Sequence, residues 1–167
     1  MPILVRPTRH DDAPALAELL NAVIARGGTT ALEEPFTAES LASAYLDGPN
    51  VICCFTAVDE ESGILEGFQT LGRYPSLPPD IGDIGTFARV GGAQRGIGTS
   101  LFAATRAEAT RQGLSAINAT IRADNSGGLA FYGRMGFQDH GVARDVPLKD
   151  GTPVDRISKR YDLSGGV

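Results

Sequence analysis

Two glycines near the middle of the chain, in the segment QRGIGTSLF at 94–102, mark a tight turn. The apolar run before it, 83–90, has the composition of a strand, and the alanine-rich segment after it, 98–112, is amphipathic like a helix. This order forms an anion site, because glycine lets the backbone approach a ligand and the first N–H groups of a helix lack internal partners. The sequence therefore predicts a phosphate-binding turn, and Arg95 adds a positive charge at its mouth.

The turn differs from the two common nucleotide-binding motifs. No Lys-Ser or Lys-Thr pair closes a Gly-x-x-x-x-Gly frame, which excludes a Walker loop. A dinucleotide fingerprint would need a third glycine and a position after the first strand, whereas this turn lies past the middle of the chain. Because Gly-x-Gly turns are common, the phosphate assignment depends on a second motif further along the chain.

Length and composition describe an ordinary globular protein. The 167 residues are 42% hydrophobic and 21% charged, which predicts one domain spanning 1–167 with a substantial core. No apolar run approaches the roughly 20 residues of a membrane span, and the N-terminus lacks the layout of a signal peptide. We therefore expect a cytoplasmic protein with no membrane partner.

Charge is distributed unevenly along the chain. The net charge of −5 argues against a nucleic acid partner. Residues 1–87 carry 4 Lys and Arg against 13 Asp and Glu, and residues 88–167 carry 11 against 7. A polyanionic ligand would favour the basic half, which contains the glycine turn, although solvated faces can differ in charge by chance. With two His, and with Cys53 and Cys54 adjacent on opposite faces of a strand, we expect neither a metal site nor a disulfide.

Hydrophobic periodicity indicates the other elements. We expect strands at 2–6, 51–58, 64–71, 83–90, 115–122, 137–146 and 153–163. Helices are expected after Thr8, which can form a capping box with Asp11, after Thr37, over 98–112, and from Asn125 to Gly136. The order is strand, two helices, three strands, glycine turn, helix, strand, helix and two strands.

This order and two linked motifs resemble the GNAT superfamily of acyl-CoA-dependent N-acyltransferases over nearly the whole chain. The second motif is IRADNSGGLAFYGRMGF at 121–137. The family form is Asn, a Tyr seven residues later and then Gly-Phe, which Asn125, Tyr132 and Gly136 with Phe137 match, while Gly128 stands where Ser is common. The resemblance implies an α/β fold: a mixed, mostly antiparallel central sheet flanked by about four helices, with a splayed pair of strands at the acyl-CoA cleft.

Within the superfamily the chain is most similar to the phosphinothricin and methionine-sulfoximine acetyltransferase group. The similar features are VRPT at 5–8, GTTA at 28–31, Asp83 five residues before Ala88, the KDG turn at 149–151 and Asp155. The resemblance implies a homodimer whose active sites lie near the interface. It also implies acetyl-CoA as co-substrate and a small, amino-acid-like primary amine as acceptor.

The family pattern assigns acetyl-CoA to the glycine turn, the strand before it and the second motif. Backbone amides of the turn would bind the pyrophosphate, the strand edge would pair with the pantetheine arm, and the N–H of Ala88 would polarise the thioester carbonyl. Asn125 is also expected to act as a helix N-cap, and the two roles are compatible. The residues expected to bind acetyl-CoA are Phe87, Ala88, Val90, Arg95, Gly96, Ile97, Gly98, Thr99, Ser100, Asn125 and Tyr132.

Acetyl transfer to an amine needs a base for the ammonium and an acid for the departing thiolate. Tyr132 is the candidate acid, since a phenol with a pKa of about 10 suits a thiolate leaving group, although a Tyr on a helix face can instead be a core residue. Asp83 is the candidate base, acting through a water. It could instead hold a cationic amine or cap a loop, and Asp80 and Glu34 are rivals for the base.

Asp83 and Ala88 are five residues apart in the same predicted strand. Side chains alternate along a strand, so this odd offset directs the two residues to opposite faces. We therefore expect a bulge near Gly85, which would re-aim one of them and splay this strand from the next where the acyl arm enters.

Two residues are candidates for the acceptor site. Arg73, at the end of a strand, could bind a substrate carboxylate through a bidentate pair, although an exposed Arg at a strand end needs no ligand, and Glu34 is the second candidate. Two other functions stay open. The chain could acetylate a protein or peptide amine, or it could bind acyl-CoA without turnover. The acidic first half suits a cationic acceptor of either size.

Overall fold

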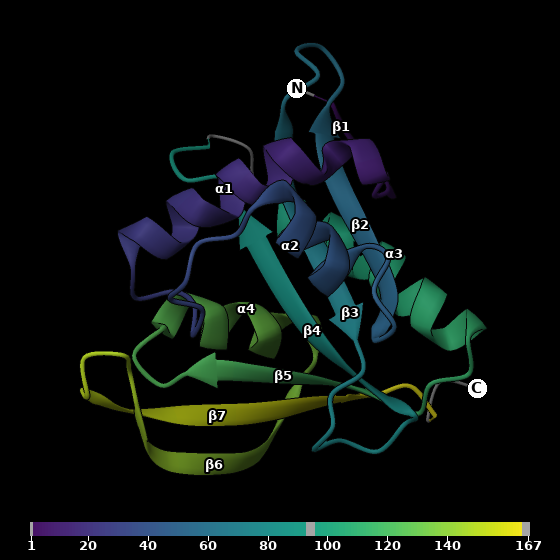
Figure 1. Ribbon diagram of the computed structural model, residues 1–167. Helices are drawn as coiled ribbons and strands as arrows, with labels where there is room; N and C mark the ends of the chain where they lie inside the picture. The colour runs from purple at the N-terminus through teal and green to yellow at the C-terminus, as the bar shows by residue number, and fades with distance from the viewer. Residues whose placement is uncertain (1, 93–95, 165–167) are drawn as a thin grey trace.

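The computed structural model describes residues 2–92 and 96–164, and within them it contains a seven-stranded sheet in the order β1-β2-β3-β4-β5-β7-β6 (Figure 1). The strands are β1 Ile3–Pro7, β2 Val51–Asp59, β3 Leu65–Gly72, β4 Ile81–Ala88, β5 Ala116–Arg122, β6 Gln138–Pro147 and β7 Pro153–Asp162. The helices are α1 Ala13–Arg26, α2 Ala38–Tyr45, α3 Ile97–Arg111 and α4 Ser126–Met135, with a short 3-10 helix at His10–Asp12. The predicted order of elements and the mixed, mostly antiparallel sheet are confirmed.

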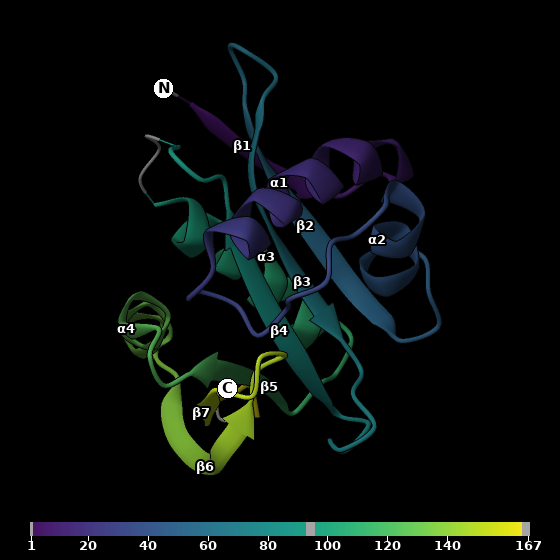
Figure 2. The same ribbon diagram turned by 60° about the vertical axis from the view of Figure 1, so that its left-hand side comes forward.

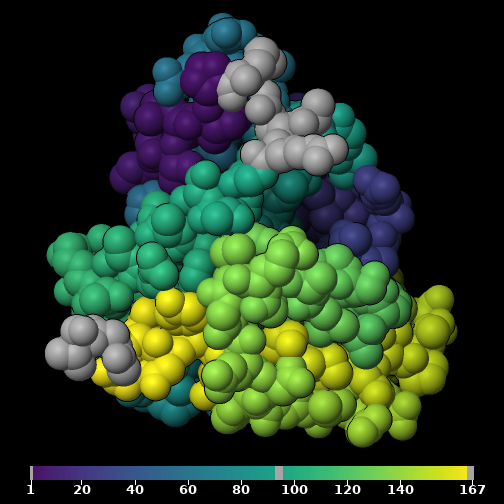
Figure 3. Space-filling model, turned by 180° about the vertical axis from the view of Figure 1, so that it is seen from behind, coloured from purple at the N-terminus to yellow at the C-terminus, as the bar shows by residue number. Residues whose placement is uncertain are grey.

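The helices cover the two faces of the sheet as separate layers. In Figure 1, α1 and α2 lie in front of the sheet, where Leu16, Leu20 and Leu41 are fully buried in one core cluster with Phe68 and Phe87. Figure 3, seen from behind, shows α3 and α4 next to one another on the opposite face. The core there includes Ile84, Phe102, Ala109, Ile117, Ala119, Ile121, Tyr132 and Phe137. Among the described residues, none of the helices has both the length and the apolar character that a bilayer crossing requires.

β4 and β5 pair in parallel over part of their length and then diverge. Their register ends at Ile84 and Ala119, while β4 continues to Ala88 and β5 to Arg122. Figure 2 shows the two strands separating at this end. β4 stays paired with β3 without a register shift as far as Ala88. The predicted splay is confirmed, but the predicted bulge near Gly85 was wrong, because the cleft opens where β5 turns away from a regular β4.

The predicted cap of the first helix was also wrong. The hydroxyl of Thr8 lies 2.6 Å from that of Thr56 on β2 and does not cap a helix. The first turn is closed by Asp12, not Asp11, because the N–H of Arg9 donates to Oδ2 of Asp12 at 2.8 Å. The Thr8 side chain therefore forms a tertiary hydrogen bond to a neighbouring strand, instead of the helix cap that the local pattern predicted.

The predicted caps of two later helices are confirmed. At α2, Oγ1 of Thr37 accepts a hydrogen bond from the N–H of Ser40 at 3.0 Å. At α4, Oδ1 of Asn125 accepts one from the N–H of Gly128 at 3.0 Å. Gly136, with φ of +103°, ends α4 in the left-handed conformation that glycine adopts most readily.

Gly98 lies where α3 and α4 pack together, and a Cβ at this position would be 2.6 Å from Cε1 of Phe131. Gly98→Ala is therefore expected to lower the free energy of unfolding by about 1–3 kcal/mol, the usual cost of overpacking. Gly133→Ala in α4 is the matched control, because its Cβ would meet no atom within 4 Å. Alanine should raise stability there by roughly 0.5–1 kcal/mol. Urea denaturation checks both values, and equal destabilisation by the two variants would contradict the packing argument.

Candidate active site

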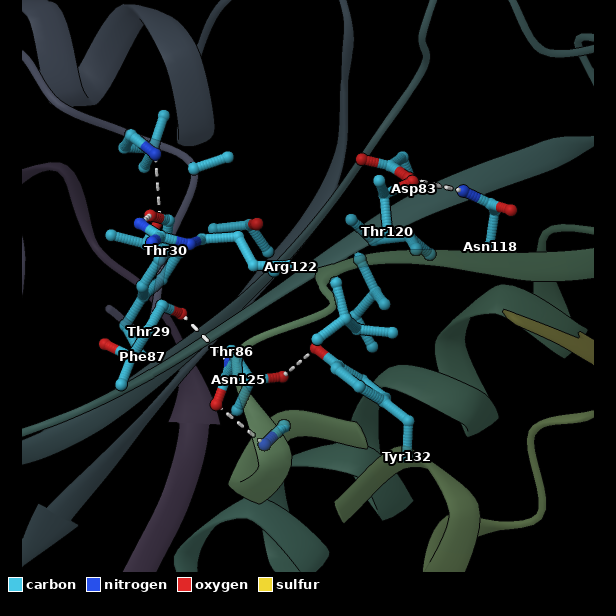
Figure 4. Close-up of a pocket in the computed structure, with 18 of the residues that line it drawn as sticks. Thr29, Thr30, Asp83, Thr86, Phe87, Asn118, Thr120, Arg122, Asn125 and Tyr132 are labelled. Atoms are coloured by element: carbon cyan, nitrogen blue, oxygen red, sulfur yellow. Dashed lines mark hydrogen bonds between the residues drawn. The ribbon is translucent and has the colours of Figure 1, made fainter. Parts of the chain in front are cut away.

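A cleft of about 1100 Å³ opens where β4 and β5 diverge. Its walls come from β3, β4, β5 and β7, the ends of α1 and α2, the first turns of α3 and α4, and the loops after α1 and β3. In Figure 4, Asp83 and Asn118 face one another on one side, and Tyr132 points toward Thr86 on the other. The two residues predicted to move protons, Asp83 and Tyr132, therefore line the same cleft.

Tyr132 is carried by α4 with its hydroxyl directed at β4. Its oxygen lies 2.8 Å from Oγ1 of Thr86, which also accepts a hydrogen bond from Nε2 of Gln69 at 3.0 Å. The ring packs edge-on against Phe131 and Phe137. Burial raises the pKa of Tyr132 to about 12, the Thr86 hydrogen bond opposes this rise, and the negative charge of Asp83 adds to it. The phenol keeps its proton at neutral pH, as a general acid must.

Asp83 is carried by β4 and is held from β5. Its Oδ1 accepts a hydrogen bond from Nδ2 of Asn118 at 2.9 Å. Burial raises the pKa of Asp83, while the Asn118 hydrogen bond and the positive charge of Arg160 lower it in part. A higher pKa makes the carboxylate a stronger base, which favours removal of a proton from an ammonium.

Asp83 and Tyr132 approach the cleft from opposite faces of β4. Side chains alternate along a strand, so Asp83 shares a face with Phe87, which packs beneath α1 and α2. Thr86 and its partner Tyr132 lie on the face that α3 and α4 cover. Because β5 has turned away, the edge of β4 lies open between the two faces. The five-residue offset between Asp83 and Ala88 therefore needs no bulge, because residues on both faces of β4 can reach the cleft at its open edge.

The open edge of β4 carries backbone groups that point into the cleft. The N–H of Arg89 donates to the carbonyl of Glu66, next to β3, at 2.9 Å. Successive N–H groups of a strand point to alternate sides, so those of Thr86 and Ala88 point away from β3. No strand in the described part of the chain pairs with them there. The residues predicted to contact the acyl arm from this segment all line the cleft: Phe87 and Ala88 at the end of β4, and Val90 in the turn after it.

The glycine turn leads directly into the N-terminus of α3. Gly96 is the N-cap, with φ of +77° in the left-handed region that favours glycine. The N–H of Ser100 donates to the carbonyl of Gly96 at 3.0 Å, so that amide serves the helix. The N–H groups of residues 97–99 have no intrahelical partner and stay available to an anion. Arg95, predicted to add a charge, lies outside the described residues.

Asn125 caps α4 and also joins it to the loop after α1. Its Nδ2 donates to the carbonyl of Thr29 at 3.2 Å, while Oδ1 accepts from Gly128. A Cβ on Gly128 would lie 2.4 Å from Nδ2 of Asn125, so this position requires glycine while Asn125 keeps its place. Arg122 makes a second link, with Nη1 donating to the carbonyl of Thr30 at 3.2 Å. These bonds hold the loop against β5 and α4 at the cleft (Figure 4).

Comparison with curated proteins gives a relative that spans almost all of the chain. The chain is 30% identical over 155 residues to the phosphinothricin N-acetyltransferase of Streptomyces coelicolor, covering 89% of this chain and 90% of the relative. The chain belongs to the GNAT superfamily of N-acetyltransferases. It resembles the phosphinothricin acetyltransferase group within that superfamily, as the motifs predicted.

Solved structures share the fold of this N-acetyltransferase. An N-acetyltransferase from Staphylococcus aureus Mu50 is 19% identical with a TM-score of 0.83, covering 98% of this chain and 99% of that one. A GNAT phosphinothricin acetyltransferase from Sinorhizobium meliloti, in complex with acetyl-CoA, is 18% identical with a TM-score of 0.84, covering 98% and 89%. No family model matches the chain.

Two of the predicted acidic residues lie away from the cleft of this N-acetyltransferase. Glu34 forms an exposed ion pair with Lys149, and Oδ2 of Asp80 accepts a hydrogen bond from Oγ of Ser115 at 2.6 Å. In the described part of the chain neither carboxylate is among the cleft residues, whereas Arg73 is. Asp83 is thus the predicted base that lies where an acyl arm could reach it.

Sequence reasoning missed several polar residues of the cleft: Tyr45, Thr86, Asn118, Arg122, Arg156 and Arg160. A signal for one group was present. In the strand predicted at 115–122, Ile117, Ala119 and Ile121 share one apolar face, so alternation gives the other face to Asn118, Thr120 and Arg122. For Thr86 there was no signal, because a Thr in a strand is ordinary.

Gly96→Asp should abolish binding of acetyl-CoA, because it places a carboxylate where the pyrophosphate is expected. Gly96→Asn is the matched control. Asn and Asp both tolerate left-handed backbone, and a Cβ here meets no atom within 4 Å, so the two variants differ mainly in charge. Isothermal titration calorimetry on the folded variants should show much tighter binding by the Asn variant. An affinity of Gly96→Asp equal to that of the wild type would remove the phosphate site from this turn.

Proposed function

We propose that this N-acetyltransferase transfers the acetyl group of acetyl-CoA to the primary amine of a small, amino-acid-like molecule. The observation that carries the proposal is the open edge of β4, which directs backbone N–H groups into one cleft between a half-buried carboxyl and a buried phenol. The S. coelicolor relative is named for phosphinothricin, and the S. meliloti structure holds acetyl-CoA. Both names support this donor and this class of acceptor.

The co-substrate would lie along β4 and the start of α3. N–H groups at 97–99 would bind the pyrophosphate, with Asn125 and Val90 near the arm. The amides of the pantetheine arm would pair with the open edge of β4, as an added strand pairs with a sheet. The N–H of Ala88 would then donate to the thioester carbonyl and stabilise the negative charge that develops on its oxygen.

In the transfer, the amine nitrogen attacks the thioester carbon, so a C–N bond forms and the C–S bond breaks. The ammonium first loses a proton to Asp83 through a water, because a protonated amine has no lone pair for attack. The departing thiolate takes the proton of Tyr132 and leaves as a thiol. As the amide forms, the attacking nitrogen loses its second proton to solvent. Solvent then returns one proton to Tyr132 and takes the one held by Asp83, so one proton is released in each turnover.

Arginines on the cleft wall support an acceptor that carries an anionic group. Arg73 and Arg156 line the cleft, and Nη1 of Arg156 is buried without a hydrogen-bond partner among the described residues. A guanidinium binds a carboxylate through two parallel hydrogen bonds. With Asp83 serving the amine, this arrangement suits a molecule that has an ammonium and an acid group close together, as an amino acid has.

We also propose that residues 1–167 form one domain, which acts in the cytoplasm as a homodimer. The sheet runs without a break from β1 to β6, which supports one domain. The free thiols of Cys53 and Cys54 suit a reducing compartment. β6 is an edge strand, exposed along nearly its whole length, on which Val142 is 49% exposed, and such an edge offers a surface to a second copy.

A thiol-release assay tests the function directly. Acetyl-CoA is incubated with the enzyme and a panel of free amino acids, polyamines and peptides, and the CoA thiol is measured. We expect release that depends on free amino acids and on acetyl-CoA together. Release with peptides alone would favour the protein-modifying alternative. Tight acetyl-CoA binding without amine-dependent release would favour a non-catalytic binding protein.

Tyr132→Phe should lower kcat by roughly 100-fold or more, the usual scale of general acid catalysis, with little change in acetyl-CoA affinity. Tyr161→Phe is the matched control. The hydroxyl of Tyr161 accepts a hydrogen bond from Arg106 at 3.2 Å and lies outside the cleft lining, so its loss should leave kcat unchanged. Steady-state kinetics with chemistry as the slow step checks this. Equal kcat values in the wild type and Tyr132→Phe would mean that Tyr132 is a core residue and not the general acid.

Asp83→Asn should depress kcat/KM most where Asp83 is ionised and the acceptor amine is still protonated. Burial raises the pKa of Asp83, so the carboxylate is lost as the pH falls through that raised value. At high pH the amine, with a pKa of about 10, loses its own proton and needs less help. The ratio of wild-type to variant kcat/KM should therefore shrink toward alkaline pH. A constant ratio would mean that Asp83 positions the substrate, and a loss in Asp80→Asn would move the base there.

A further inference from the structure

A chain of hydrogen bonds leads from β7 through β5 to Asp83. Nε of Arg160 donates to Oδ1 of Asn118 at 2.7 Å. Nδ2 of Asn118 then donates to Oδ1 of Asp83 at 2.9 Å and to Oγ1 of Thr120 at 3.1 Å. The strand register aligns them, since Asn118 is opposite Asp83 on one side and opposite Arg160 on the other. Asn118 is 4% exposed, so water does not compete for its amide.

Arg160 decides which end of the Asn118 amide faces Asp83. A guanidinium has hydrogen-bond donors and no acceptor, so the Asn118 atom that it contacts must be the oxygen. The amide nitrogen is then turned toward β4 and finds the carboxylate. If the amide were reversed, its oxygen would face the carboxylate oxygen. Both atoms are acceptors, so no hydrogen bond could form between them. Arg160 and the Asp83 carboxylate therefore select the same orientation of the amide, and loss of Arg160 removes one of these two constraints.

We propose that Asn118 and Arg160 are positioning residues for acetyl transfer, which hold Oδ1 of Asp83 and leave its Oδ2 for the proton of the acceptor amine. The proposal rests on the proposed role of Asp83 as the base. Neither Asn118 nor Arg160 acts on the reacting atoms. Arg160 acts on Asn118, and Asn118 fixes the carboxylate in one orientation beside the open edge of β4 (Figure 4).

The groups that share an electrostatic interaction with Asp83 come from three other strands and helices. Tyr45 on α2 and Tyr132 on α4 each have a pKa raised to about 12, mainly by burial and in part by the charge of Asp83, so both are neutral near pH 7. Arg160 on β7 carries the positive charge. The Asn118 hydrogen bond and the Arg160 charge lower the pKa of Asp83 against the effect of burial. Loss of either residue should therefore raise the pKa of Asp83 further.

The test measures kcat/KM for the amine against pH in the wild type, Asn118→Leu and Arg160→Met. Because the base must be ionised, activity falls as the pH drops through the pKa of Asp83, and this acid limb should move to higher pH in both variants. At the acid end kcat/KM should fall by about tenfold or more, the scale of one hydrogen bond to a charged group. It should approach the wild-type value as the pH rises. Arg160→Lys, which keeps a charged donor, should restore part of the profile.

Lys159→Met is the matched control for charge. Lys159 is next to Arg160 on β7, points to the other face and bonds to Asp139 at 2.6 Å. Lys159→Met removes one positive charge from β7, as Arg160→Met does, but the charge lies on the other face. The acid limb of its pH profile should therefore coincide with that of the wild type. Thermal unfolding and acetyl-CoA affinity are measured for every variant. Arg160 is half-buried, so Arg160→Met remains a folded test if Asn118→Leu, which is deep in the sheet, does not fold.

The outcomes separate the two proposals. A loss of kcat/KM that is uniform over pH in Arg160→Met, or an acid limb that does not move, would overturn the positioning role. Full activity and an unchanged profile in Asp83→Asn would overturn the proposed base itself. If Asp83→Asn is impaired while the acid limbs of the Asn118 and Arg160 variants coincide with that of the wild type, the base stands and the positioning role fails.

Discussion

The end of pairing between β4 and β5 at Ile84 and Ala119 is the constraint on which the site depends. In a closed sheet, the next strand would take the N–H groups of Thr86 and Ala88. In the cleft Thr86 is half-buried and Ala88 is exposed, so water can bond to their N–H groups until a ligand with carbonyl groups of its own replaces it. At the far end of β5, Arg122 and Asn125 donate hydrogen bonds to the loop after α1, which attaches this end of the strand to the loop.

Hydrophobic periodicity predicted the order of elements because it reports which face of each element is buried. Its errors occur where a tertiary partner decides the outcome. Thr8 was assigned to a helix cap, but its hydroxyl bonds to Thr56, 48 residues away. The bulge near Gly85 was inferred from β4 alone, whereas the opening comes from the path of β5. The sequence of β4 holds no information about the point at which β5 stops pairing with it.

The site residues that belong to a sequence motif could be predicted. Those that are brought together only by the register of paired strands could not. Asp83 followed from its place five residues before Ala88, a feature shared with the similar group, and Asp80 and Glu34 stayed as rivals because acidic residues look alike in sequence. The ion pair of Glu34 with the turn at 149–151 separates them in space. Asn118 and Arg160 are 42 residues apart, and their contact is created by the pairing of β5 with β7.

Burial in one cleft raises the pKa of both Tyr132 and Asp83, with opposite consequences for their roles. A raised pKa secures the proton that Tyr132 must donate, but it also threatens to protonate the base. An acyl arm that fills the cleft would expel water and strengthen both effects. The carboxylate then depends more on the Asn118 donor and on Arg160, and the incoming ammonium adds a positive charge that favours ionisation further. One cleft can keep a phenol protonated and a carboxyl ionised because β4 separates them, with a neutral hydroxyl beside the first and a cation near the second.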